Sequence, residues 1–221
     1  MKYLLTNRKI IQITGDDILG FLQGLITNDV KLLEKQNGFY SAMLTPNGRF
    51  LYDFFVISKN NEIFIDIADI FADSFIQTLT KYKLRRKIDF IKTSFNVISS
   101  PEKSDFSFQD NRFKSEIYRN IGNYEGREQN DEYNSFLIQN LIVDGRFIPQ
   151  EKGIILEYDF EKLNGVSFEK GCYLGQELIQ RTKRIGQIRK KIAMVKHSDN
   201  LDFITSDGSF AIVFEKDDRL G

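Results

Sequence analysis

The sequence predicts an α+β fold built mainly on antiparallel β-sheet. The first observation is the spacing of apolar residues over residues 8–98, which predicts a strand, a helix, a hairpin, a strand, a helix and a strand in that order. The second is the turn T-P-N-G at residues 45–48, between strand-like stretches at 40–44 and 49–58. Its Asn-Gly pair readily adopts positive φ, which is typical of a hairpin, and a hairpin joins antiparallel strands.

The elements of the N-terminal half follow from the spacing of apolar residues. β-Branched residues predict a strand at 8–14, and Gly15-Asp16-Asp17 offers a turn and an N-cap for a helix that ends at 27–29. A second helix is predicted over 68–82, between strands at 62–67 and 88–98. The apolar faces of the two helices are Ile18, Phe21, Leu22, Leu25 and Ile26, and Ile70, Phe71, Phe75, Ile76 and Leu79.

The C-terminal half is predicted with fewer regular elements. Residues 99–111 are polar and form a connection, which divides residues 1–190 into halves of about 1–99 and 100–190. The patterns then indicate a strand at 113–118, a loop at 126–131, a helix at 132–141, and strands at 192–195 and 210–214 around an Asp-Gly turn at 207–208. Residues 191–221 are predicted to be a separate, smaller β module.

Composition excludes several classes of protein. Basic and acidic residues number 31 each, so no net charge points to nucleic acid or to an anionic membrane as a partner. No apolar run is long enough to span a membrane, and the N-terminus lacks the apolar centre of a signal peptide. One cysteine excludes an internal disulfide and a C-x-x-C site. We therefore expect a soluble, cytoplasmic protein with neither nucleic acid nor membrane as a partner.

The single cysteine, Cys172, lies between two glycines just before a predicted helix. Leu174, Leu178 and Ile179 have helical spacing, and Glu177 falls in an early turn, where a negative charge suits the helix dipole. The positive end of the helix and the nearby Lys170 are expected to lower the pKa of the thiol and favour the reactive thiolate. The alternative is a small buried hydrophobic residue, which is the usual role of a lone cysteine.

The segment K-G-C-Y-x-G-Q-E resembles the hallmark of the YgfZ-type folate-binding proteins, which support iron–sulfur cluster maturation and are related to the glycine-cleavage aminomethyltransferase, or T-protein. The stretches at 15–30, 147–151 and 163–168 are similar to other segments of that family. The resemblance implies an aminomethyltransferase-like folate-binding domain, with a truncated C-terminal β module in place of the β-barrel that family members carry. The matching motif residues are Lys170, Gly171, Cys172, Tyr173, Gly175, Gln176 and Glu177, followed by Arg181.

The resemblance also implies folate contacts. Asp53, in T-P-N-G-R-x-x-x-D-F, matches the acidic residue that the aminomethyltransferases keep for the pterin and the reacting nitrogen, although Tyr52 stands where those enzymes tend to carry a second Asp. Tyr118 and Arg119 open a segment similar to the family's Y-R-x-x-x-G-x-P-E-G, one residue shorter and without the proline. The aromatic wall that a pterin needs has four candidates, Tyr40, Phe54, Tyr118 and Tyr173.

Two basic clusters are candidates for the anionic glutamate tail of a folate, because Arg pairs well with carboxylates. The alternative is that both are solvated surfaces that complement helix C-termini. Lys183, in the second cluster, is the residue assigned to the cofactor. The clusters are Lys81, Lys83, Arg85, Arg86 and Lys87, and Arg181, Lys183, Arg184, Arg189, Lys190 and Lys191.

The predicted function is that of a tetrahydrofolate-binding accessory protein for iron–sulfur cluster assembly or repair, with Cys172 as its reactive thiol. One cysteine cannot hold a cluster alone, so the other ligands must come from a scaffold or client protein, a second copy of the chain, or a small thiol. No other metal site is predicted. We expect the protein to lie in the cytoplasm if its source is bacterial, and in the mitochondrial matrix if its source is eukaryotic.

Two alternatives remain open at this stage. One is a tetrahydrofolate-dependent aminomethyl or one-carbon transferase, which Asp53 supports and Tyr52 weighs against. The other is an interaction module that keeps the fold and lacks the ligand. Cysteine hydrolase chemistry is disfavoured because it needs a histidine beside the thiol, and the only histidine, His197, is distant in sequence and expected to be exposed.

Overall fold

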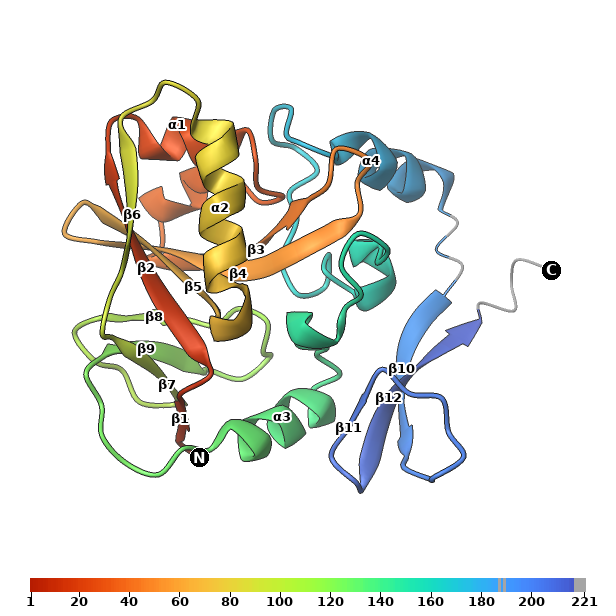
Figure 1. Ribbon diagram of the computed structural model, residues 1–221. Coiled ribbons are helices and arrows are strands. Elements are labelled where there is room, and N and C mark those ends of the chain that lie inside the picture. The colour runs from red at the N-terminus through yellow and green to blue at the C-terminus, as the bar shows by residue number, and fades with distance from the viewer. Residues whose placement is uncertain (187, 189, 217–221) are drawn as a thin grey trace.

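Three antiparallel sheets form the framework of the computed structural model, which describes residues 1–186, 188 and 190–216 (Figure 1). The central sheet has the strand order β3-β4-β5-β2-β6, the second sheet β1-β7-β9-β8, and the third β10-β12-β11. These pairings confirm the predicted α+β fold. The strands of the first two sheets are β1 (Tyr3–Leu5), β2 (Arg8–Gly15), β3 (Gly38–Leu44), β4 (Phe50–Lys59), β5 (Glu62–Ala68), β6 (Ile88–Lys92), β7 (Asn96–Ser100), β8 (Ser107–Gln109) and β9 (Tyr118–Gly122).

Helices α1 and α2 cover one face of the central sheet (Figure 1). Tyr52 and Phe54 of β4 lie on this face, where the Phe54 and Phe75 rings are 4.9 Å apart and both are fully buried. Truncating a buried phenylalanine typically costs about 3–5 kcal/mol, so this layer contributes strongly to stability. The helices are α1 (Ile18–Gln23), α2 (Ala72–Lys83), α3 (Asn130–Gln139) and α4 (Gln176–Ile185), with 3₁₀ turns η1 (Val30–Glu34), η2 (Asp69–Phe71), η3 (Gly145–Phe147) and η4 (Ile155–Tyr158).

The helix predictions are confirmed with small changes at the ends. The exception on the predicted apolar faces is Ile70, which lies in η2 before α2 and is 68% exposed. Asp17 is the N-cap residue of α1, but its carboxylate makes no capping hydrogen bond and instead pairs with Arg86 at 3.0 Å. In the described ranges, no helix has the length and apolar character needed to cross a bilayer.

The opposite face of the central sheet is buried as well, and it carries charge. Asp66 of β5 accepts a hydrogen bond from Arg8 Nε at 2.7 Å and another from Arg119 Nε at 2.7 Å. Arg119 belongs to β9, so this carboxylate joins the central sheet to the second sheet. Burial opposes ionisation of Asp66, but the charges of Arg119 and Arg8 outweigh it and lower its pKa.

Two strand predictions are wrong. The stretch 88–98 is not one strand, because the chain leaves the central sheet after β6 and enters the second sheet as β7, which pairs with β1 and β9. The strand predicted at 113–118 is instead a loop, since Arg112 and Phe113 fold back in a turn on Asp110. The strands in this region are β8, inside the predicted connection, and β9. Strand β1 was missed.

The third sheet comprises β10 (Lys190–Lys196), β11 (Thr205–Ser206) and β12 (Phe210–Lys216), in agreement with the two predicted strands and the turn at 207–208. Ile192 and Ile212 belong to the same apolar cluster as the second face of the central sheet, and Phe214 packs edge-on against Tyr158. Residues 217–221 of the predicted module lie outside the described residues. The division of the chain near residue 190 stays a prediction.

Replacing Asp66 with Asn should lower the free energy of unfolding at pH 7 by about 3–5 kcal/mol, because it leaves the buried Arg8 without its ion-pair partner and Arg119 with only the more distant carboxylate of Asp110, 3.7 Å away. Asp73→Asn is the control, since the Asp73–Lys92 pair is solvent-exposed and worth under about 1 kcal/mol. Urea unfolding measures both. Because the Asp66 pKa is lowered in the fold, its contribution is present above the ordinary Asp pKa of about 3.9 and is lost as pH falls through the folded value. Equal losses in the two variants would contradict this account.

Candidate functional site

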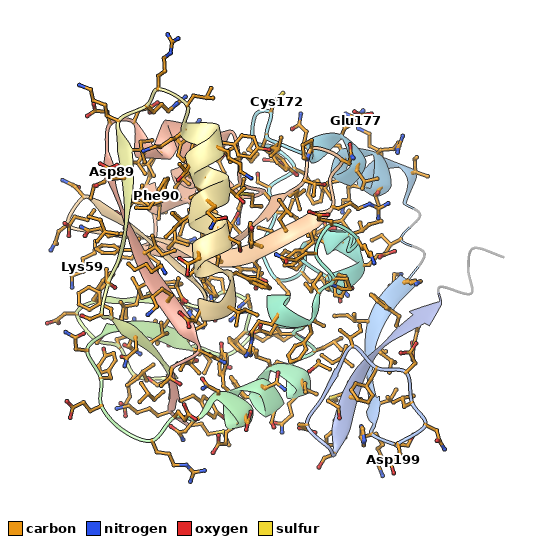
Figure 2. All side chains as sticks on the ribbon, in the orientation of Figure 1. Lys59, Asp89, Phe90, Cys172, Glu177 and Asp199 are labelled. Carbon is orange, nitrogen blue, oxygen red and sulfur yellow. The ribbon has the colours of Figure 1, made fainter. Side chains whose placement is uncertain are left out.

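Cys172 is exposed, in a loop that precedes α4. The helix begins at Gln176 with Gly175 as its N-cap, so the pattern that included Leu174 in the helix placed its start too early. Cys172 and Glu177 lie at the same end of the molecule (Figure 2). The structure therefore contradicts the buried-residue alternative for Cys172.

Lys170 anchors this loop. Its ammonium donates to the carbonyls of Gln23 at 2.7 Å, Ile26 at 2.8 Å and Asn28 at 2.9 Å, which uses all three of its N–H groups. Burial lowers the pKa of Lys170 to about 8, with Asp29 acting in the opposite direction. Lys170 therefore has no N–H left to donate to a neighbouring thiolate, and the predicted effect of its charge on Cys172 stays a prediction.

The remaining motif residues are mostly structural. Tyr173 is buried, and its backbone N–H donates to Gln176 Oε1 at 3.3 Å. Gly175 has φ +80° and touches the T-P-N-G hairpin so closely that an added Cβ would lie 2.4 Å from the Thr45 carbonyl oxygen. Within K-G-C-Y-x-G-Q-E, Gly171, Cys172 and Glu177 are exposed, and so is Arg181 after it. The motif thus builds a fixed loop that presents a single thiol.

Asp53 lies far from solvent, on the second face of the central sheet, with 2% of its surface exposed. Tyr40 Oη donates to its Oδ2 at 2.9 Å, while Oδ1 is buried without a hydrogen-bond partner among the described residues. An added Cβ on Gly145 would lie 1.7 Å from Oδ1, so only glycine fits there. Burial and the charge of Asp144 raise the pKa of Asp53, against the opposing effect of Arg8.

Tyr52 belongs to the opposite layer, where its ring packs against Phe71 and Phe75. Neighbouring residues of a strand point to opposite faces. An aspartate at position 52 would therefore not complete a pair with Asp53, and the departure at this position removes no group from the Asp53 side of the sheet.

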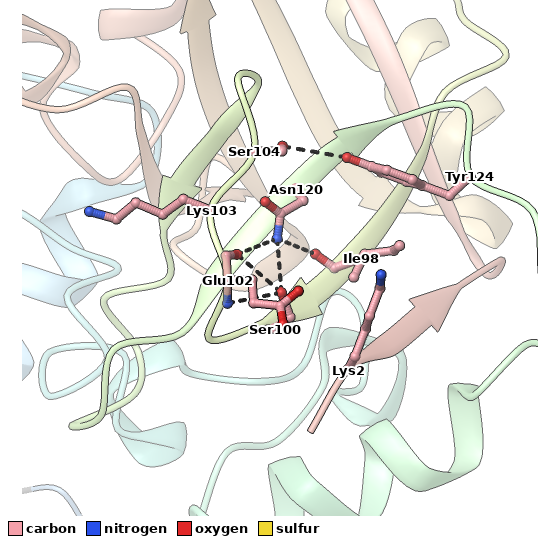
Figure 3. A pocket seen from close by; sticks show the side chains of 8 residues that line it. All are labelled: Lys2, Ile98, Ser100, Glu102, Lys103, Ser104, Asn120 and Tyr124. Carbon is pink, nitrogen blue, oxygen red and sulfur yellow. Dashed lines mark hydrogen bonds between the residues drawn. The ribbon is translucent and has the colours of Figure 1, made fainter.

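Tyr118 and Arg119 are buried rather than open to a ligand. The Arg119 guanidinium is committed to Asp66 and to Tyr133 Oη, 3.1 Å away. The next residue, Asn120, ties β9 to the loop after β7 through its Nδ2, which donates to Ser100 Oγ at 3.2 Å and to the Glu102 carbonyl at 3.0 Å (Figure 3). Asn120 also lines a pocket of about 90 Å³. In the structure, residues 118–120 connect β9 to neighbouring elements. The predicted contact of Tyr118 and Arg119 with folate stays a prediction.

The two basic clusters lie on different elements. Lys83 and Arg86 are engaged at the end of α2, with Asp89 and Asp17. On α4, Lys183 forms an ion pair with Glu161, while Arg181 is exposed and lines a hollow of about 340 Å³ beside η4. Arg189 lies outside the described residues.

His197 is not exposed as predicted. Its side chain is 20% exposed, and its Nδ1 lies 2.8 Å from Ser206 Oγ in the third sheet. Asp199, in the turn after β10 and 3.7 Å from His197 Nε2, lies at the opposite end of the molecule from Cys172 (Figure 2). Among the residues that the structure describes, no three His, Cys, Asp or Glu side chains gather as a metal site.

Comparison with known proteins identifies the relationship. No protein-family model matches the chain. An iron–sulfur cluster assembly factor IBA57 homologue, mitochondrial, from Dictyostelium discoideum is 30% identical over 248 residues, which cover 85% of this chain and 60% of that protein. This chain is similar to the IBA57-type assembly factors. Another, from Mycosarcoma maydis, is 29% identical over 84% of this chain and 54% of its own length. The chain thus spans little more than half the length of these relatives.

The glycine cleavage system aminomethyltransferase T of Bartonella henselae has the same fold. Its crystal structure matches 97% of this chain and 78% of its own with a TM-score of 0.66, at 12% sequence identity. These findings confirm the predicted resemblance to the T-protein fold and to the iron–sulfur maturation proteins related to it.

Two neighbours of Asp53, Asp144 and Gly145, were missed by the sequence reasoning. They belong to an Asp-Gly-Arg turn in which Asp144 Oδ1 accepts from Arg146 Nε at 2.8 Å. The Asp-Gly pair is itself a turn signal, but its position against a strand about 90 residues earlier depends on the tertiary fold.

Gly175→Ala should destabilise the protein by about 2–4 kcal/mol, because the new Cβ meets the hairpin backbone and a positive φ is strained for alanine. Gly171→Ala is the matched control from the same motif, since its Cβ would meet nothing within 4 Å. Thermal and urea unfolding measure the difference. A Gly171→Ala variant that is destabilised as much as Gly175→Ala would show that the loop packs differently.

Proposed function

We propose that the chain acts in the assembly or repair of iron–sulfur clusters, with Cys172 as its reactive thiol. The observation that carries the proposal is the exposed Cys172, on a loop fixed by the other residues of its motif, in a chain similar to proteins named as iron–sulfur cluster assembly factors. Those relatives are mitochondrial by name, which supports the mitochondrial matrix as the location if the source is eukaryotic.

A single thiolate makes this chain one contributor to a cluster rather than its sole holder. Protein-bound clusters are commonly held by four cysteine thiolates, so three would come from a scaffold or client protein, a second copy of the chain or a small thiol. The exposure of Cys172 and Gly171 allows a partner to approach the sulfur. The protein is in this proposal an accessory factor, and its partners are the iron–sulfur proteins it serves.

A tetrahydrofolate is the proposed ligand of the Asp53 side of the central sheet. The residues suit it. Asp53 Oδ1, which has no hydrogen-bond partner among the described residues, would accept from the N–H groups of a pterin, and the Tyr40 ring would flank it. The closeness of Gly145 to Asp53 Oδ1 means that the η3 turn would have to move aside to admit a ring. Relatives' names do not mention folate, so this part rests on the residues and on the T-protein fold.

A tetrahydrofolate-dependent aminomethyl or one-carbon transferase is the second candidate. It is favoured by Asp53, a buried carboxylate with a raised pKa, and Tyr52 does not weigh against it as the sequence alone indicated. Turnover of an aminomethyl donor in the presence of tetrahydrofolate would support it over the accessory role.

A cell depleted of its own IBA57-type factor provides the test of the main proposal. The wild-type chain should restore the activity of iron–sulfur enzymes, and Cys172→Ser should fail to do so, because serine lacks the thiolate that binds iron. Immunoblotting establishes that both are present in equal amounts. Full rescue by Cys172→Ser would overturn the role assigned to the thiol.

The folate part is tested by calorimetric titration with tetrahydrofolate. Wild type and Cys172→Ser should bind in the micromolar range, and Asp53→Asn should bind at least about tenfold more weakly, a loss of about 1.4 kcal/mol. Because burial penalises ionised Asp53, the same variant should be more stable than wild type at neutral pH. A raised carboxyl pKa disfavours the fold as pH rises through it, so this gain should vanish below about pH 4. Unchanged affinity would remove Asp53 from the site.

A further inference from the structure

We infer that Lys170 is the positioning residue of the thiol loop: its ammonium latches the loop onto the carbonyl-lined turn after α1 and so fixes where Cys172 is presented. This inference rests on the proposed function of Cys172 and adds a part of the machinery to it. Lys170 does not touch the reacting sulfur in this account. Its effect passes through the backbone of the loop.

The turn after α1 is a ready acceptor for a cation. The carbonyls of Gln23, Ile26 and Asn28 converge there within 2.9 Å of one nitrogen. Carbonyl groups at the end of a helix lack helical partners and carry partial negative charge. An ammonium with three tetrahedrally placed N–H groups satisfies all of them at once, which a planar guanidinium or an amide does not.

The loop is held on both sides of the thiol. Before Lys170, the Ser167 backbone N–H donates to the Thr27 carbonyl at 3.0 Å, and after Cys172 the Leu174 N–H donates to the Gly24 carbonyl at 3.0 Å. Lys170 is the side-chain fastening between these two backbone bonds, and its charge also lies 5.0 Å from the Tyr173 ring. Cys172 is thus a short exposed span between fixed points.

Losing the ammonium would leave three partly buried carbonyls without their donor, each at a typical cost of about 1–3 kcal/mol when fully buried. The loop would then lift from the turn, because only the backbone bonds of Ser167 and Leu174 would remain. The position of the sulfur, rather than the fold of the sheets, is what depends on this contact.

The single cysteine makes the test specific. A nitroxide label attached to Cys172 through a disulfide reports the motion of the loop by electron paramagnetic resonance. The wild-type spectrum should show a restrained label and Lys170→Met a freely mobile one, with correlation time shortened at least about threefold. Lys170→Arg should not restore the wild-type line shape, because its planar fork does not match three converging carbonyls. Lys183→Met is the matched control, a lysine of α4 whose pair with Glu161 is at the surface.

A second variant keeps the test informative if Lys170→Met folds poorly. In Lys170→Gln the amide offers two N–H groups for three carbonyls, so its label mobility should lie between that of wild type and that of Lys170→Met.

The two proposals fail separately. Identical line shapes for wild type, Lys170→Gln and Lys170→Met would overturn the latch. A mobile label in Lys170→Met combined with full rescue of depleted cells by Cys172→Ser would retain the latch and overturn the role of the thiol. If both proposals hold, the iron–sulfur enzyme activity that Lys170→Met restores to depleted cells should be at least about fivefold lower than with wild type. Its urea midpoint of unfolding should stay close to the wild-type value.

Discussion

The fold depends on one carboxylate, Asp66, held between Arg8 of its own sheet and Arg119 of the next. Charged groups are costly to bury, and here the cost is offset because each charge meets an opposite one at hydrogen-bonding distance. The contact fixes how the second sheet lies across the central one, and with it the segments that follow β9. Among them are the η3 turn beside Asp53 and the loop that carries Cys172. An apolar interface would give the layers more freedom to slide, since packing is less directional than a paired charge.

The same buried face explains why Asp53 is distinct among its neighbours. Asp110 and Asp66 each meet arginine at 2.7 Å, and Asp144 meets Arg146 at 2.8 Å. In the part of the chain that the structure describes, the Tyr40 hydroxyl is the only hydrogen-bond partner of the Asp53 carboxyl group. A carboxylate left partly unsatisfied where its neighbours are satisfied is a local departure from good packing. Such departures concentrate at functional sites, because groups kept available for a ligand cannot also be saturated by the protein.

Elements whose structure depends on neighbouring residues in the sequence could be predicted from the sequence alone. Short windows of sequence predicted the Asn-Gly turn, the strands at 192–195 and 210–214, and the apolar faces of the two helices that cover the central sheet, apart from the exposed Ile70. The failures have a different cause. The stretch 88–98 reads as one strand because both of its ends are apolar, and only the competition between two sheets divides it. Arg119 and Lys170 look like ligands because they are charged, and no window of sequence places Asp66 or the carbonyls of the α1 turn beside them.

The thiol loop and the Asp53 side of the sheet are joined by a continuous set of hydrogen bonds. Tyr40 holds Asp53 through its hydroxyl, and its backbone carbonyl accepts from Asn28 Nδ2 at 2.9 Å. The Asn28 carbonyl is in turn one of the three that hold Lys170, 2.9 Å away. Each link is short and largely buried, so displacement of Tyr40 would shift the turn on which the loop is fastened. The two features that the sequence presents as separate motifs are therefore parts of one mechanical unit, with Asn28 as the shared joint.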